Sequence, residues 1–99
     1  MSNSAFKKQL LEEGFGIIPN SVLFAQSLQP FDKLLFCYIS CLCAEKGYCF
    51  AGNEYLSEKM NASVRYIQKS LSKLKAKNFI RIQIVNNCQR EIYLNEFFK

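Results

Sequence analysis

A chain of 99 residues, with 49% hydrophobic and 21% charged side chains, is expected to fold as one globular domain rather than to be disordered. The formal net charge of +5 favours a nucleic acid or another acidic surface as partner. The longest apolar-rich run, residues 34–44, is too short to span a bilayer, which takes about 20 residues, and the first 15 residues lack an apolar signal core. We therefore expect a cytoplasmic protein with no membrane partner.

The N-terminal part of the chain is expected to stand apart from the main domain. Residues 1–14 form a separate segment with a possible short helix, which Ser4 can cap and Gly14 can end. This segment could pack on the domain, mediate dimerisation or fray, and the sequence favours none of the three. The domain itself is assigned to residues 15–99.

The first half of this domain predicts a buried helix between extended segments. Residues 15–24 read as an extended lead-in, or as an edge strand, around the turn signal at residues 19–20. Pro30 is suited to the first turn of a helix over residues 31–45. Apolar residues lie on nearly every side of that helix, so we expect it to be the central buried one. A short strand is expected at residues 48–51.

Two further helices are predicted, joined by a tight turn. Asn53 is expected to cap a helix over residues 54–60, and Ser63 to cap a longer helix over residues 64–77. Asn78 can end the longer helix in a left-handed conformation.

A two-stranded hairpin should follow these helices. Residues 80–85 alternate, with Ile80, Ile82 and Ile84 on one face and Arg81, Gln83 and Val85 on the other. An Asn-Asn pair then signals a turn, and residues 91–94 return as the second strand. A hairpin of this size is marginal alone, so it should pack on the helices.

The predicted fold is a single winged helix-turn-helix domain, mainly α with a small β wing. Its core should be made of residues whose spacing places them on inward faces. These are Leu35, Ile39, Leu42, Leu56, Ile67, Leu71, Leu74, Ile80, Ile82 and Ile92.

Positive charge is concentrated in the second half of the chain. Eight basic residues and no acidic residue lie from position 59 to position 90, whereas the other residues together carry a net charge of −3. The eight are Lys59, Arg65, Lys69, Lys73, Lys75, Lys77, Arg81 and Arg90. A run of positive charges without negative ones, on a folded unit of helices and a hairpin, is typical of a nucleic-acid-binding surface.

Four pieces of the chain form a familiar pattern of apolar spacings, a Ser cap and a helix-ending turn. They are IPNSVL at 18–23, LLFCYISCLC at 34–43, KGYCFAGNEYLSEKM at 46–60 and SVRYIQKSLSKLKAKNFIRI at 63–82. This pattern resembles the N-terminal winged helix-turn-helix domain of the replication initiators, or replisome organisers, of phages and plasmids of Gram-positive bacteria. The resemblance covers about two-thirds of the chain and implies DNA binding in replication. The family usually has Gly before the wing, where this chain has Asn78.

The polar face of the helix over residues 64–77 is the expected DNA contact. Arg65, together with Gln68, can make forked contacts with base edges in a major groove, and Lys69 and Lys73 suit phosphates as point charges. The helix start can also hold a phosphate, and small side chains allow close approach to the groove. The predicted DNA-binding residues are Ser63, Arg65, Tyr66, Gln68, Lys69, Ser72, Lys73, Arg81 and Arg90.

Other interpretations of these residues stay open. The basic face could simply be solvated, or it could contact an acidic protein. Tyr66 could pack against Met60 or the wing, and Arg81 and Arg90 could be charges that protect strand edges.

Metal, cofactor and catalytic roles are not expected. The chain has five cysteines, namely Cys37, Cys41, Cys43, Cys49 and Cys88, and no His. No C-x₂-C pair is present, so the spacing is poor for zinc, and we expect five reduced thiols that pack as small hydrophobic residues. Without His, neither a Ser-His nor a Cys-His dyad can form.

These observations predict a double-stranded DNA-binding protein of a phage or plasmid, acting in replication initiation or in transcriptional regulation, for example as an autoregulatory repressor. A homodimer on paired half-sites is a possible form. The alternative is a small mobile-element protein that uses the same fold to bind a protein, such as an inhibitor of a host-defence complex.

Overall fold

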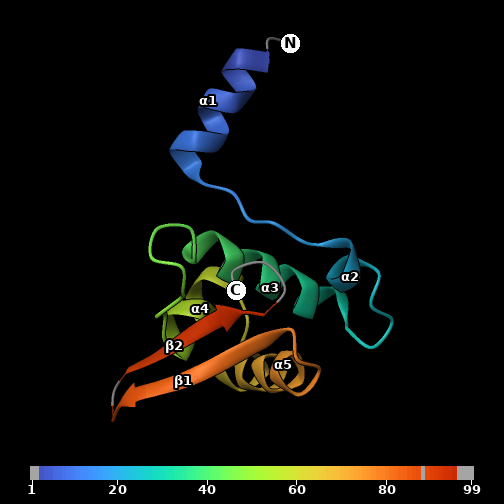
Figure 1. The fold of residues 1–99 in the computed structure, drawn as a ribbon, viewed down its shortest axis with the longest axis vertical. Coiled ribbons are helices and arrows are strands. Elements are labelled where there is room, and N and C mark those ends of the chain that lie inside the picture. The colour runs from blue at the N-terminus through green and yellow to red at the C-terminus, as the bar shows by residue number, and fades with distance from the viewer. Residues whose placement is uncertain (1–2, 88, 96–99) are drawn as a thin grey trace.

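The computed structural model describes residues 3–87 and 89–95 and contains five helices followed by a two-stranded sheet (Figure 1). The helices are α1 (Asn3–Glu13), α2 (Asn20–Leu23), α3 (Pro30–Leu42), α4 (Asn53–Met60) and α5 (Val64–Ala76), and the strands are β1 (Ile80–Asn86) and β2 (Gln89–Leu94). None of the helices in this described part is long and apolar enough to cross a membrane.

Helix α3 is the central helix of the domain. Pro30 opens it, and Gln29 and Asp32 form a reciprocal capping box in which the Gln29 N–H donates to Asp32 Oδ2 at 2.8 Å. Phe36 and Ile39 are fully buried on its inner side. The expectation that this helix is the central buried one is confirmed, although one face is left uncovered, where the side chain of Leu34 is 57% exposed.

Helices α4 and α5 are joined by a short turn that local signals define well. Asn61 ends α4 with a positive φ of 55°, and Ser57 Oγ donates to the Ala62 carbonyl across the turn. Ser63 caps α5, as predicted, by accepting a hydrogen bond from the Tyr66 N–H at 3.1 Å. The prediction that Asn53 caps α4 is wrong, because Gly52 is the N-cap and α4 already includes Asn53.

The hairpin packs on the helices through its inner face. Asn78 has a φ of 65° and ends the α5 segment as predicted, and β1 then pairs antiparallel with β2. The predicted strand over residues 48–51 is reduced to one antiparallel bridge between Cys49 and Ile92. Ile84 lies on the same face of β1 as Ile80 and Ile82 but is 70% exposed, because its strand extends beyond the helices there.

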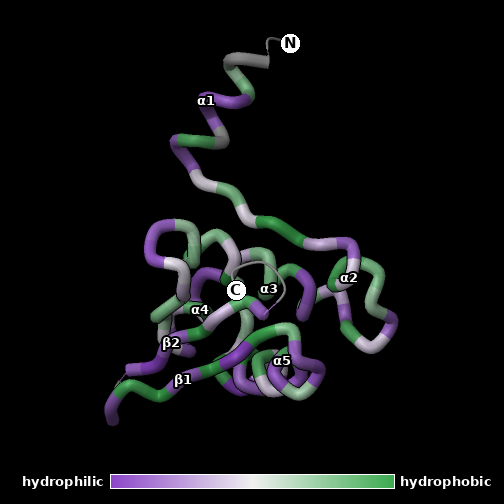
Figure 2. Tube along the Cα trace, viewed as in Figure 1, coloured by the Kyte–Doolittle hydropathy of each residue, from purple (hydrophilic) through white to green (hydrophobic). Residues whose placement is uncertain are grey.

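The predicted core is confirmed. Eight of its ten residues are buried, and Leu42 and Ile82 are half-buried against the others. The predicted core list did not include six further buried hydrophobic residues, which are Val22, Leu28, Phe36, Cys43, Cys49 and Leu94. Figure 2 shows hydrophobic colour along much of α3, whereas α1 mixes hydrophobic and hydrophilic residues.

The N-terminal segment stands clear of this core, and α1 projects from the body of the domain (Figure 1). Helix α1 already includes Ser4, so Ser4 is not its cap. Residues 15–24, all of them described, contain no edge strand. The Pro19 carbonyl instead accepts hydrogen bonds from the Val22 and Leu23 N–H groups, and the one-turn helix α2 begins there.

Candidate nucleic-acid interface

The outer face of α5 is polar, basic and exposed, whereas its inner face is anchored in the core. Ile67, Leu71 and Leu74 are buried at 0–3% exposure. The residues exposed on the other sides of the helix include Arg65, Tyr66, Gln68, Lys69, Ser72, Lys75 and Ala76. A helix held from behind in this way presents its outer side chains without needing them for stability.

The start of α5 is also exposed. Ser63 lies on the surface, and its hydroxyl oxygen is used to accept the Tyr66 N–H. The positive end of the helix dipole therefore points to solvent beside Arg65, an arrangement that favours an anion.

Tyr66 packs against a partner that the sequence did not suggest. Its ring centroid lies 4.6 Å from that of Phe31 on α3, with the ring planes tilted by 43°. The side chain remains 43% exposed, so one part of the ring supports the α3–α5 contact and another part faces solvent.

Lys73, which the sequence predicts as a phosphate contact, does not belong to the free basic face, because its charge is paired within the domain. Its Nζ lies 2.9 Å from Oδ2 of Asp32, whose residue exposure is only 2%. Ser70 Oγ donates to the other oxygen, Asp32 Oδ1, at 2.5 Å. Lys73 thus compensates a buried carboxylate and ties α5 to the first turn of α3.

These donors decide the charge state of Asp32. Burial alone would raise the pKa of the carboxyl, but the hydrogen bonds from Ser70, Lys73 and the Gln29 N–H, with the charge of Lys73, outweigh burial and lower the pKa. Asp32 is therefore ionised at neutral pH, and its negative charge neutralises Lys73.

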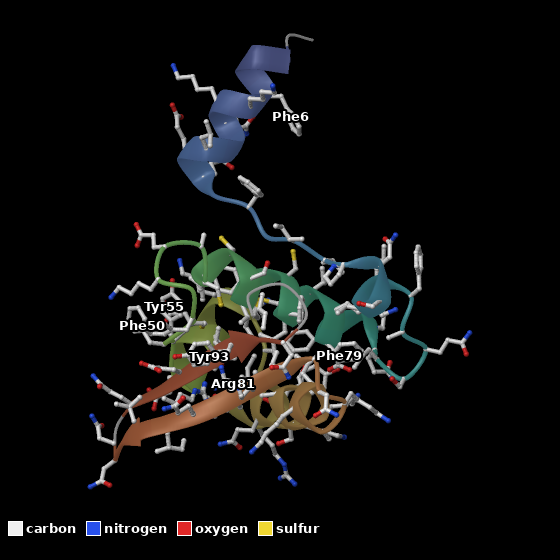
Figure 3. The ribbon with its side chains drawn as sticks, viewed as in Figure 1. Phe6, Phe50, Tyr55, Phe79, Arg81 and Tyr93 are labelled. Atoms are coloured by element: carbon white, nitrogen blue, oxygen red, sulfur yellow. The ribbon has the colours of Figure 1, made fainter. Side chains whose placement is uncertain are left out.

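The two arginines of the hairpin are engaged in different ways. Arg81 is exposed and its guanidinium lies 4.2 Å from the ring centroid of Tyr93, on the paired strand (Figure 3). Arg90 is half-buried and its Nη2 donates to the Ala51 carbonyl at 3.1 Å and to Asn53 Oδ1 at 2.5 Å. Burial lowers the pKa of Arg90, whose Nε is buried and has no hydrogen-bond partner among residues 3–87 and 89–95. Arg90 therefore fastens β2 to the start of α4 rather than acting as a free edge charge.

The geometry of α4, α5 and the hairpin agrees with a comparison against known families. A family model described as a helix-turn-helix domain matches residues 26–80, which is more than half of the chain. The chain belongs to this helix-turn-helix family. No curated protein and no solved structure gives a significant match.

The matched range of the helix-turn-helix domain contains α3, α4 and α5 and ends at the first residue of β1. Helices α4 and α5 are the helix-turn-helix unit, and β1 with β2 is the wing, so the predicted winged helix-turn-helix fold is confirmed. Helices α1 and α2 lie outside the matched range.

The thiols of this helix-turn-helix domain pack inside it or beside it. Cys43 and Cys49 are buried, Cys37 and Cys41 are half-buried, and all four are free. Burial raises the pKa of Cys43 to about 12 and also raises the pKa values of Cys37 and Cys49. No group of three His, Cys, Asp or Glu side chains suited to a metal occurs in residues 3–87 and 89–95. The fifth thiol, Cys88, lies outside the described residues.

Proposed function

We propose that this protein binds double-stranded DNA by placing α5 in the major groove. The observation that carries the proposal is the exposed basic face of α5 on the second helix of a helix-turn-helix unit. The absence of acidic residues between positions 59 and 90 supports it, because no carboxylate on this segment would repel phosphates. We propose no catalytic or cofactor-dependent activity.

The exposed residues take different roles in this proposal. Arg65 and Gln68 lie near the helix start and reach base edges, where a forked guanidinium or amide can read a base pair. Lys69 contacts a phosphate, and the start of α5 at Ser63 binds a second phosphate. Ser72 is small enough to let the groove approach. Arg81, exposed on the wing, adds a contact with the backbone.

The first test removes two charges from this face. The variant Arg65→Ala/Lys69→Ala should lose most of its affinity for duplex DNA while its melting temperature stays within a few degrees, because both side chains are exposed. Each lost phosphate contact should flatten the slope of log K against log salt by about 0.9. The slope should therefore change by about 1.8 if both residues contact phosphate, and by about 0.9 if Arg65 contacts only bases. Fluorescence anisotropy over a range of salt concentrations measures both quantities.

The matched control is Lys33→Ala/Lys46→Ala, which removes the same charge from α3 and from the loop after it, outside both α5 and α1. It should leave the affinity within about twofold at moderate salt, where charges beyond one Debye length are screened. If both variants weaken binding equally, the effect reflects net charge and the role of α5 is contradicted. Arg65→Ala alone should relax sequence preference.

For the biological role, we propose replication initiation or transcriptional regulation on a phage or plasmid. The support is the resemblance of residues 18–82 to the DNA-binding domain of phage and plasmid replication initiators. Footprinting on the DNA of the phage or plasmid distinguishes the two roles: protection of the replication origin favours replication initiation, and protection of a promoter favours transcriptional regulation.

Protein binding is the second candidate function, and an exposed apolar pocket favours it. Phe50 is 64% exposed and Tyr55 is 44% exposed, and both line a pocket of about 440 Å³ together with Leu42 (Figure 3). Exposed aromatic side chains beside a pocket are typical anchors of protein interfaces. If the wild-type protein shows no duplex binding even at low salt, the DNA proposal is wrong and this function replaces it.

A further inference from the structure

Helix α1 carries apolar side chains that its own domain does not cover. Phe6 is 51% exposed and Leu11 is 78% exposed, and Figure 3 shows Phe6 projecting sideways from α1, which we call the arm, clear of the body of the domain. At the base of the arm, Phe15 and Ile17 are 53% and 44% exposed. Apolar side chains left in water along one continuous segment are a feature of interaction surfaces.

The arm is poorly stabilised as an isolated helix. It has 11 residues, whereas isolated helices shorter than about 12–15 residues are marginal in water. Its charges also oppose the helix dipole, because Lys7 and Lys8 lie in the first half and Glu12 and Glu13 lie in the last turn. The side-chain hydrogen bond from Gln9 Nε2 to Glu13 Oε1 at 3.1 Å offsets little of this. The helix therefore needs a packing partner.

The base of the arm is held against α3. The Ile17 N–H donates to Ser40 Oγ at 2.6 Å, and Ser40 Oγ donates to the Cys37 carbonyl at 2.6 Å. Gly16 lies so close to Cys37 that an added Cβ would be 2.1 Å from the carbonyl oxygen. Residues 16–17, which follow α1, are therefore held against α3, whereas α1 itself projects from the domain.

The charge pattern of α1 selects the partner. We propose that α1 is a dimerisation arm that packs antiparallel against α1 of a second copy of this chain. In that arrangement the half of each arm that carries Lys7 and Lys8 runs beside the half of the other arm that carries Glu12 and Glu13, and the opposite charges also offset the unfavourable dipole of each helix. A parallel pair would place like charges side by side.

The second copy also covers an apolar hollow at the base of the arm. A pocket of about 400 Å³ opens between the arm and α3, lined by Leu11, Phe15, Cys41 and Ala44 among others. The dimer contact is therefore the arm and this hollow together. It is distinct from α5, so dimerisation does not depend on DNA binding.

Charge reversal tests the antiparallel pairing directly. Lys7→Glu/Lys8→Glu makes the arm wholly acidic, and Glu12→Lys/Glu13→Lys makes it wholly basic. Each variant alone should weaken self-association by about tenfold or more, since several attractive pairs become repulsive. The quadruple variant, which exchanges the two charge clusters, should dimerise again. Sedimentation velocity of the full chain over a range of concentrations measures each association.

Mixing the acidic-arm and basic-arm variants gives the most informative result, because neither should dimerise alone and together they should form a heterodimer. Both double variants improve the match between charge and helix dipole, but each also makes the i,i+4 pair at positions 8 and 12 repulsive, so circular dichroism is needed to show that the helix is retained. A second variant, Phe6→Ser, should weaken the dimer without changing the charges.

Two outcomes would overturn the proposal. One is a wild-type chain that stays monomeric at the highest concentration reached, and the other is self-association that is indifferent to all three charge variants. The Arg65→Ala/Lys69→Ala variant should dimerise like the wild type. Failure of the arm and failure of the DNA-binding face therefore give different results.

Discussion

Replacing Asp32 with Ala should lower the free energy of unfolding by about 3 kcal/mol, because the change removes three charge-assisted hydrogen bonds at a buried site. Ser70 is left buried without its acceptor, and the first turn of α3 loses its capping box. For a domain of this size, where 1 kcal/mol shifts the melting temperature by about 4–8 °C, the melting temperature should fall by about 12–24 °C. Thermal and urea unfolding followed by circular dichroism measure the change.

The effect of Asp32 should depend on pH in acid. Because the folded-state pKa of this carboxyl lies below its unfolded value of about 3.9, its stabilisation is complete above that pH and is lost as the pH falls through the folded-state pKa. The difference in stability between wild type and Asp32→Ala should therefore shrink below about pH 4. Glu45→Ala, which removes an exposed carboxylate, is the matched control and should change stability little. A loss for Asp32→Ala no larger than for this control would contradict the assigned role.

Leu71→Ala should cost about 2–5 kcal/mol of folding stability, since the Leu71 side chain is 3% exposed and its removal leaves a cavity between α5 and the rest of the core. Urea unfolding should show a lower midpoint with an unchanged slope, as expected when stability changes but the exposed surface does not.

Ile84→Ala is the matched control for this change. It also shortens an aliphatic side chain, but Ile84 is 70% exposed on the wing, so the expected loss is within about 0.5 kcal/mol. Equal losses for the two variants would show that the inner face of α5 is not the packing surface of the domain.

Features determined by a few neighbouring residues could be predicted from the sequence. The Ser63 cap needs only the N–H of Tyr66 three residues later, and the end of the α5 segment needs only the tolerance of Asn78 for a positive φ. The inward stripe of α5 follows from the helical repeat. Asn53 failed as a cap because Gly52 occupies that position and the Asn53 side chain instead accepts a hydrogen bond from Arg90.

Contacts between distant parts of the chain could not be predicted. Lys73 meets Asp32 across 41 residues, and Arg90 meets the Ala51 carbonyl across 39 residues. Helical spacing placed Lys73 at the edge of the exposed face but could not show that α3 brings a buried carboxylate to it. Helical periodicity therefore predicted the exposed residues of the candidate interface, such as Arg65 and Lys69, but not that Lys73 and Arg90 are held by contacts within the domain.

The buried native thiols allow opening of the core to be measured without introducing a reporter residue. Cys43 ends α3, and Cys49 exchanges two backbone hydrogen bonds of 2.8 Å with Ile92 on β2. Only a thiolate reacts with an alkylating reagent, and burial disfavours that form at both sites. Each thiol can react only when its part of the structure opens to solvent. Cys43 Sγ also donates to the Ile92 carbonyl at 3.7 Å, so separation of the wing should expose both thiols. Rates of modification at Cys43 and Cys49, resolved by mass spectrometry and compared with the rate of global unfolding, therefore report whether the wing separates from the helices before the domain unfolds.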